Sequence, residues 1–269
     1  MELHTPPAEK DTNLMPVLFV GHGSPMNAIQ DNDFVRSWKN LGETLPVPRS
    51  ILCVSAHWQT RGTRVTAMPH PPTIHDFGGF PPELYEIQYP APGDPELAGE
   101  IMRTTTAEPD EKWGLDHGTW SILRHMYPDA RIPVVELSLD SGLTPRGHYE
   151  FARQLFPFRE KGILILCSGN IVHNLQRIAW DKAAEEEFGF DWAIRATGII
   201  KQRIMENRHD ELIDYLLLGR DVQLAAPTPE HFLPLLYALA LKNDEEPLSF
   251  FNDKHIMGSL SMTSVKVGE

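Results

Sequence analysis

Short runs of consecutive apolar residues alternate along this chain with stretches of helical periodicity. The apolar runs show little of the polar alternation of a half-exposed strand and cover residues 16–20, 50–56, 132–139 and 162–167. The stretches with helical spacing cover residues 34–41, 95–105, 145–155, 192–206 and 230–241. Continuously apolar strands suit a sheet that is covered on both faces, and strands that alternate with helices form layered α/β structures. We therefore predict an α/β fold with a central, mostly parallel sheet and helices on both faces.

One domain accounts for the organisation of the chain. Its 269 residues contain no internal repeat and no linker, so we expect residues 15–269 to form a single α/β catalytic domain behind a flexible N-terminal tail, residues 1–14. Residues 69–93 interrupt the alternation, because they are dense in proline and glycine and carry several aromatic side chains. Loops of this length are usually functional or disordered, and the aromatic content favours an ordered, functional loop.

Composition excludes several classes of partner. A formal net charge of −13, without any basic cluster, argues against a nucleic-acid surface. No apolar run approaches the roughly 20 residues that span a bilayer, and the polar N-terminal stretch lacks the apolar core of a signal peptide. We therefore expect a cytoplasmic protein without a membrane segment. Cys53 and Cys167 lie inside apolar strands, where reduced core residues are more common than disulfides or ligands.

Four of the twelve histidines occupy similar positions in the predicted fold. His22 and His57 follow the first two apolar runs directly, and His173 follows the run that ends at residue 167. His231 stands at the start of the last helical stretch. Ligands of open α/β sheets bind beyond the carboxyl ends of the strands, so these side chains converge by topology. The glycines on both sides of His22 allow a sharp turn and leave space for a ligand.

Neutral imidazoles that converge on one point suit Zn, Fe, Cu or Ni. Each histidine taken alone has an ordinary alternative, since a histidine at a strand end is more often a hydrogen-bonded loop residue than a ligand. No HExxH motif and no CxxC pair supplies a local metal motif. The prediction of a metal site therefore rests on the convergence of four histidines.

At these residues the chain resembles the class III extradiol ring-cleavage dioxygenases, and within them the 4,5-DOPA dioxygenase type. The segments that carry the resemblance are Gly-His-Gly-Ser-Pro at 21–25, Ser-Ala-His-Trp at 55–58, Ile-His-Asp-Phe-Gly-Gly-Phe-Pro at 74–81, Tyr-Pro-Ala-Pro-Gly at 89–93, Asp-His-Gly-Thr-Trp at 116–120, Ser-Gly-Asn-Ile-Val-His-Asn at 168–174 and Pro-Thr-Pro-Glu-His at 227–231. They span nearly the whole chain in order. The resemblance implies an enzyme that inserts both atoms of O2 into a small catechol, L-DOPA or a related compound, and opens its ring to a semialdehyde.

The resemblance also implies one divalent metal, held by His22, His57 and His231, with His173 as the nearby acid/base or as a fourth ligand. Iron(II) is expected for activity. The wider class uses two histidines and a glutamate, whereas here His231 takes the last place and Glu230, at the start of a helix, is expected to point elsewhere. Three histidines with an open position also describe a catalytic zinc site, so Zn(II) in the isolated protein is equally consistent with the ligands.

Other residues of these segments have candidate roles beside structural ones. His117 is either a group that orients oxygen or the catechol hydroxyl, or a capping histidine of a loop. Asp76 is expected to fix the orientation of His75. Three aromatic side chains of the same loop either wall the substrate ring or simply pack on the sheet: Phe77, Phe80 and Tyr85. Asn174 is a cap or a substrate contact.

Two other functions fit the same histidines. A zinc hydrolase would use the metal to activate water, but it needs a carboxylate base near the metal, and none of the four histidine motifs supplies one clearly. A binding protein stabilised by metal would use all four histidines in a closed site. The sequence leaves open the physiological catechol, the ring bond that breaks and the oligomeric state.

Overall fold

The computed structural model describes residues 14–182 and 186–269. In that part of the chain eight strands form one sheet, in the order β4-β3-β5-β2-β6-β1-β10-β7. The strands of this sheet are β1 (Val17–Gly21), β2 (Ser50–Thr60), β3 (Arg64–Thr66), β4 (Glu108–Asp110), β5 (Val134–Asp140), β6 (Ile163–Gly169), β7 (Leu248–Phe251) and β10 (Ser264–Val267). A separate small antiparallel pair consists of β8 (His255–Ile256) and β9 (Leu260–Ser261). The predicted tail lies outside the described residues, apart from Leu14.

The four predicted apolar runs form the parallel centre of the sheet, β5-β2-β6-β1. Successive residues of these strands enter different cores, since Val17 and Phe19 belong to one apolar cluster and Leu18 and Val20 to the other. Burial on both faces explains why the runs lack polar alternation. The predicted α/β class with a mostly parallel sheet is confirmed.

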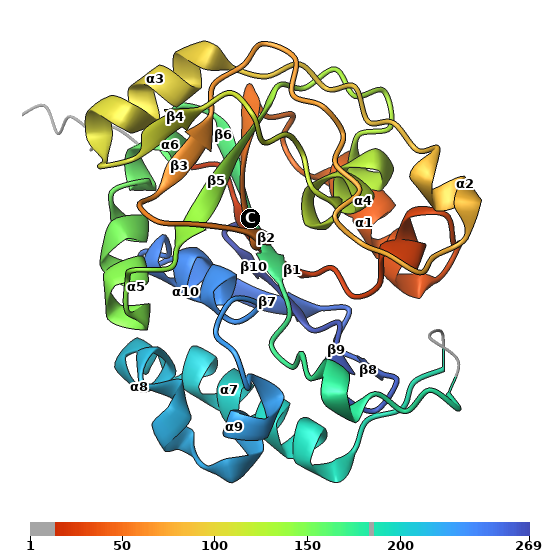
Figure 1. Cartoon of the computed structure of the whole chain (residues 1–269). Helices are drawn as coiled ribbons and strands as arrows, with labels where there is room; N and C mark the ends of the chain where they lie inside the picture. Colours follow the sequence, from red (N-terminus) through yellow and green to blue (C-terminus); the bar gives the residue numbers. More distant parts are fainter. Residues whose placement is uncertain (1–13, 183–185) are drawn as a thin grey trace, which may run out of the picture.

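Helices cover both faces of this sheet. Figure 1 shows α1 and α4 on one side and α5 and α10 on the other. The α-helices are α1 (Asp33–Thr44), α2 (Pro82–Tyr85), α3 (Pro95–Thr104), α4 (His117–Met126), α5 (Pro145–Arg153), α6 (Phe156–Glu160), α7 (Asp191–Met205), α8 (His209–Ile213), α9 (Arg220–Ala225) and α10 (Leu233–Ala240). Short 3-10 helices are η1 (Pro25–Ala28), η2 (Leu175–Arg177) and η3 (Tyr215–Leu218).

Two predicted helices differ from the observed ones because of proline. The helix predicted over 145–155 is α5, which ends at Arg153, and a separate helix, α6, follows with a proline in its first turn. The stretch 230–241 becomes helical only at Leu233, again with a proline in the first turn. Proline lacks the N–H that a helix interior requires, but the first turn has no use for it. His231 therefore lies in the turn before α10 and not in the helix.

The loop 69–93 is an ordered connection, as predicted. Its helical content in the described structure is the single turn α2, and a bridge between Thr73 and Leu115 attaches it to the segment before α4. The indole Nε1 of Trp120 on α4 donates to the Ile74 carbonyl, 2.8 Å away. The loop is therefore fixed to α4, beside the carboxyl end of the sheet.

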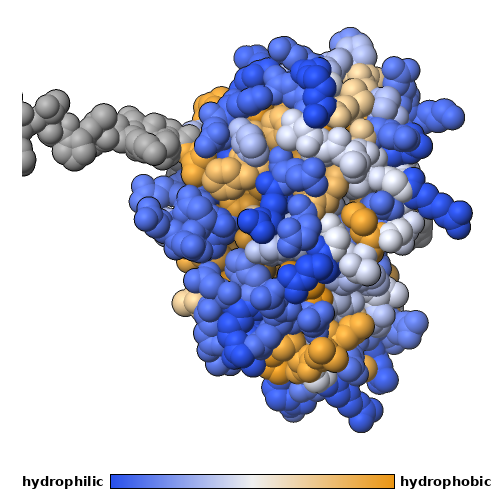
Figure 2. Space-filling model, turned by 90° about the vertical axis from the view of Figure 1, so that its left-hand side faces the viewer, coloured by the Kyte–Doolittle hydropathy of each residue, from blue (hydrophilic) through white to orange (hydrophobic). Residues whose placement is uncertain are grey.

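On the face shown in Figure 2 hydrophilic side chains predominate, and hydrophobic ones gather in a patch near its lower end. None of the described helices is both long and apolar enough to cross a bilayer. The two cysteines are buried and unpaired, as predicted.

Candidate metal centre

His22, His57 and His231 meet at the carboxyl ends of the central strands. Each offers a ring nitrogen within 4.8 Å of those of the other two. The ring centroids are 4.9 Å apart for His22 and His57, 5.3 Å for His22 and His231, and 5.0 Å for His57 and His231. Side chains separated by some two hundred residues of chain thus form one cluster, as the topology predicted.

The strands explain how each side chain reaches this point. His22 follows the last residue of β1, and Gly23 after it has a φ of 64°, a conformation that favours glycine. His57 does not lie past its strand as expected, because β2 continues to Thr60. The pairing of β2 with β5 shifts register between Val54 and Gln59, and His57 lies within that irregularity. Irregular pairing re-aims a strand side chain, here towards His22.

Ser168 determines which nitrogen of His22 carries the proton. Its hydroxyl donates to the Gly118 carbonyl at 2.7 Å, so its oxygen is left to accept from Nδ1 of His22 at 2.9 Å. The Nε2 lone pair of His22 then faces Nε2 of His57, 3.1 Å away. Ser168 was part of a quoted motif but was not predicted to act, because the sequence does not show that β6 lies beside β1.

Glu230 contacts His231, contrary to the expectation that it points elsewhere. Its Oε1 lies 3.4 Å from Nδ1 of His231 and also accepts from the Thr228 hydroxyl at 2.7 Å. The two residues lie in a turn before α10, where neighbouring side chains can meet, and not on a helix. Burial raises the pKa of Glu230, but these hydrogen bonds outweigh it and hold the pKa at about 2. Nε2 of His231 is buried and has no hydrogen-bond partner.

Asp76 faces the histidines of the centre and not His75, which corrects the predicted pairing. The Asp76 carboxylate lies 2.9 and 3.0 Å from Nδ1 of His117 and 3.4 Å from Nδ1 of His57. His75 instead directs Nε2 to the Ile87 carbonyl at 3.0 Å.

This arrangement fits a divalent cation. In each of the three histidines Nδ1 faces an acceptor, so the three Nε2 lone pairs point into one small space. Two nitrogens 3.1 Å apart match two ligands that lie roughly 2.1 Å from one ion at an angle of roughly 95°. Burial is the main reason that the pKa of His22, His57 and His231 lies below the ordinary value, so all three are neutral at pH 7. Neutral imidazoles with free lone pairs bind Zn(II) and Fe(II).

His173 and His117 border this cluster on two sides. The ring of His173 stacks on that of His231, and burial lowers its pKa to about 3. His117 is the first residue of α4, with its ring centroid 4.0 Å from that of His57. Both predicted residues therefore lie beside the three clustered histidines. Asn174 donates its side-chain amide to the Leu224 carbonyl, which is a structural contact.

A buried carboxyl pair behind α4 was not predicted from the sequence. Asp116 caps the helix and accepts from Ser55, and Glu136 accepts from Thr119 and from the backbone N–H of Asp116. Burial is the largest cause that raises the pKa of both carboxyl groups. Glu136 lies within an apolar run, where a single acidic residue gave no signal of its partner twenty positions away.

Glycine permits the close packing around the histidines. A Cβ atom on Gly169 would overlap the carbonyl oxygen of His231. A Cβ atom on Gly118 would lie 2.9 Å from the Ser55 hydroxyl and 3.0 Å from Cδ2 of His57. The turn that carries His231 therefore rests directly on the end of β6, and α4 rests directly on β2.

The remaining histidines of the described chain are exposed or make structural hydrogen bonds. His70 is exposed, and the hydrogen-bonded pairs are His125 with the Asn27 carbonyl, His148 with Tyr237, His209 with Tyr149 and His255 with Thr197. His4 lies outside the described residues.

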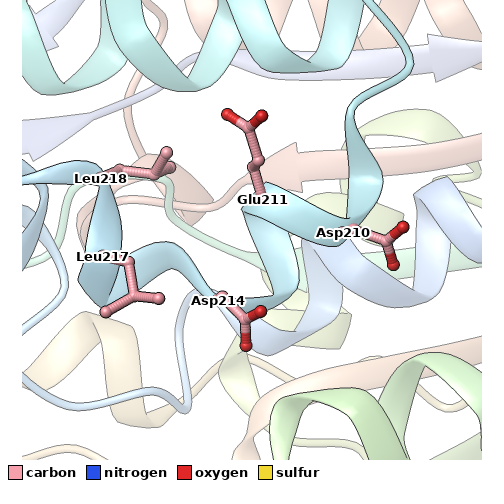
Figure 3. Close-up of a pocket in the computed structure, with 5 residues that line it drawn as sticks. All are labelled: Asp210, Glu211, Asp214, Leu217 and Leu218. Carbon is pink, nitrogen blue, oxygen red and sulfur yellow. The ribbon is translucent and has the colours of Figure 1, made fainter.

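A surface pocket on α8 and η3 is separate from this centre. Figure 3 shows its lining, which consists of Asp210, Glu211, Asp214, Leu217 and Leu218. Its carboxylates are largely engaged, since Glu211 pairs with Arg203 and Arg208, and Asp210 pairs with Arg146. The pocket contains no histidine and no converging polar group, so it offers no alternative centre.

Comparisons with known proteins agree with the geometry. The family described as the catalytic LigB subunit of aromatic ring-opening dioxygenase matches residues 15–266. A relative named 4,5-DOPA dioxygenase extradiol from Escherichia coli (strain K12) is 47% identical, with 94% of this chain and 95% of that protein covered. A Beta vulgaris protein of the same name is 34% identical, with 95% and 97% covered. The crystal structure of an uncharacterized protein from Escherichia coli K12 has a TM-score of 0.81 and 42% identity, and the match covers 94% of this chain and 100% of that one.

Proposed function

We propose that this chain, which belongs to the LigB family of aromatic ring-opening dioxygenases, opens the ring of a small catechol with dioxygen. Membership of the family makes the chain a ring-cleaving dioxygenase. L-DOPA or a close relative is the substrate that we propose, because the full-length relatives from Escherichia coli and Beta vulgaris are named for 4,5-DOPA. The proposed product is an open-chain semialdehyde that retains both oxygen atoms.

The observation that carries the proposal is the set of three Nε2 lone pairs. We assign the metal to His22, His57 and His231, with Fe(II) in the active enzyme, and Zn(II) also fits these ligands. Bound there, the ion would supply Lewis acidity that favours an ionised catechol and, as iron, a path by which electron density passes from the catechol ring to dioxygen. Ser168, Asp76 and Glu230 keep the three lone pairs directed at one point.

His173 is proposed to move the proton of the reaction and not to bind the metal. The plane of its ring is parallel to that of His231, and a ligand nitrogen directs its lone pair within the plane of its own ring. Two stacked rings therefore cannot both point at one ion. Neutral at pH 7, His173 is able to accept the proton that a catechol hydroxyl releases on binding. Burial lowers the pKa of His173 to about 3, so its ring is a neutral imidazole and not an imidazolium when substrate binds.

His117 borders the centre on the opposite side, next to His57. Its ring meets that of Phe77 edge to face, with centroids 5.5 Å apart, and Phe77 in turn lies 5.2 Å from Tyr85. We propose that His117 orients the oxygen or the catechol hydroxyl, and that these aromatic rings flank the substrate ring and exclude water. Aromatic side chains are suited to this role, because edge-to-face contacts select for flat rings.

The two alternative functions have less support. A hydrolase needs a free carboxylate base near the metal, but Asp76 and Glu230 both face the Nδ1 atoms of histidines. A closed structural site needs a fourth ligand, and the parallel ring of His173 does not supply one. Family membership also favours ring opening over both.

Anaerobic reconstitution of the apoprotein with Fe(II), followed by L-DOPA and air, tests the proposal. We expect oxygen uptake and a yellow ring-opened product, and the zinc-loaded protein is the control without redox chemistry. No oxygen uptake with L-DOPA or any simpler catechol, together with hydrolysis of esters or amides by the zinc form, would overturn it.

A further inference from the structure

We propose that Asp76 is a positioning residue that fixes the proton on Nδ1 of both His57 and His117, so that both Nε2 atoms face the centre as acceptors. The meaning of this for catalysis rests on the proposed function.

The Asp76 carboxylate faces three nitrogen atoms, which are the backbone N and Nδ1 of His117 and Nδ1 of His57. Its Oδ1 accepts from the backbone N–H of His117 at 2.9 Å and lies 2.9 Å from Nδ1 of the same residue. Its Oδ2 lies 3.0 Å from Nδ1 of His117 and 3.4 Å from Nδ1 of His57. An ionised carboxylate can only accept, so a nitrogen that faces it is stabilised when it carries the proton. Both rings are then left with a lone pair on Nε2.

Hydrogen bonds between the loop and the α4 region fix the position of this carboxylate. Ile74 donates its N–H to the Leu115 carbonyl at 2.7 Å, and the Trp120 indole donates to the Ile74 carbonyl. Asp76 therefore reaches the first turn of α4, where exposed backbone N–H groups favour a negative charge. Its side chain is only 13% exposed, so water competes little for the two rings.

One carboxylate therefore couples the two halves of the site. His57 is a proposed metal ligand, His117 borders the substrate position, and their ring centroids are 4.0 Å apart. If either proton moved from Nδ1 to Nε2, that ring would present an N–H to the centre instead of a lone pair. For His57 the result would be a blocked ligand.

Substitution of Asp76→Asn separates the two contacts. The amide keeps one acceptor oxygen, which satisfies both N–H groups of His117, and it turns an NH2 group towards Nδ1 of His57. Since two donors cannot share that contact, His57 should move its proton to Nε2 while His117 keeps its own on Nδ1. The control is His75→Gln, which alters the adjacent side chain of the same loop but touches neither histidine of the centre.

Two measurements on the apoprotein give the test. Long-range 1H–15N spectra of histidine-labelled protein report the tautomer of each ring, and calorimetry with Zn2+ and a competing chelator gives the affinity. In Asp76→Asn we expect His57, and no other ring, to change to the Nε2–H pattern, with about 10–100-fold weaker Zn2+ binding, and we expect wild-type values for the His75→Gln control. Wild-type tautomers and affinity in Asp76→Asn would overturn the inference. The proposed function fails separately, if wild-type protein binds metal with these tautomers but consumes no oxygen with any catechol.

Discussion

The imidazole of His173 lies flat on that of His231, with ring centroids 3.5 Å apart and an angle of 9° between the planes. Parallel planes at this separation share no point, so no single ion can lie in the plane of both rings. The relationship distinguishes His231, a proposed metal ligand, from a histidine that lies beside it. It predicts different effects for alanine substitutions of His231 and His173.

We expect His22→Ala, His57→Ala and His231→Ala to lose bound metal, because each removes one of three converging lone pairs. His173→Ala should keep its metal and lose turnover by about 10²–10⁴-fold, the usual contribution of a positioned acid or base. Metal content by mass spectrometry and oxygen uptake by electrode give the two values. Loss of metal in His173→Ala as well would make His173 a ligand.

The Ser168→Ala variant tests how the tautomer of His22 is set. Without the hydroxyl, Nδ1 of His22 loses its acceptor, and we expect about 10–100-fold weaker metal binding. Ser138→Ala is the matched control, since Ser138 is also a fully buried strand serine whose hydroxyl makes two hydrogen bonds, with Thr60 and with the backbone N–H of Arg64. A chelator competition on both variants gives the result. Equal losses in the two would mean that Ser168 acts only through stability.

The convergence of the histidines could be predicted because it follows from the parallel direction of the strands and does not require their order. His22 and His173 each follow a buried apolar run, and parallel neighbours end at the same edge of a sheet. Such runs are visible in sequence because burial on both faces makes most of their residues apolar. The same argument could not place Asp76, because a loop has no period and its direction depends on contacts with α4.

Elements with weak sequence signals were missed for a physical reason. Strand β10 is short and contains Ser264 and Lys266, yet it extends the sheet antiparallel to β1. Its pairing is decided by backbone hydrogen bonds to a strand that lies more than two hundred residues earlier. Helix α4 was missed because its first turns contain Gly118, Thr119 and Ser121, which are weak helix formers.

Gly169→Ala should disturb the centre through the backbone. The added methyl group overlaps the carbonyl oxygen of His231, so the turn before α10 must move and take its imidazole with it. We expect a loss of about 1–3 kcal/mol in the free energy of unfolding, together with weaker metal binding. Gly198→Ala on α7 is the control, because nothing lies within 4 Å of the new methyl group and alanine favours a helix. Urea unfolding and a metal titration of both variants measure the two changes. Unchanged metal affinity in Gly169→Ala would contradict the prediction.

Phe77→Leu tests the proposed aromatic wall. The Phe77 ring makes edge-to-face contacts with His117 and Phe80, and a leucine keeps the apolar character but loses the flat ring. We expect the KM for L-DOPA to rise about 5–10-fold, which corresponds to roughly 1 kcal/mol of ring contact, with a smaller change in kcat. Phe188→Leu is the control. Phe188 is also half-buried, but its ring contacts other residues, the ring of Phe190 and the ammonium group of Lys182. A fall in kcat at constant KM would instead assign Phe77 to the support of His117.

His148 gives the protein a dependence of stability on pH that is separate from the metal centre. It is buried beside Tyr237, whose hydroxyl lies 3.1 Å from Nδ1, and burial lowers its pKa from 6.5 to about 4, although Asp140 acts in the opposite direction. Below pH 6.5 the unfolded chain takes up a proton that the folded protein refuses, so folding loses stability as the pH falls from 6.5 to 4 and is unaffected above. Between pH 7.5 and 5 this loss amounts to about 2 kcal/mol. The variant His148→Gln keeps a polar partner for Tyr237 but does not titrate. Urea unfolding at both pH values should therefore show a smaller loss for the variant than for the wild type by that amount, whereas identical losses would show that His148 is protonated in the folded protein.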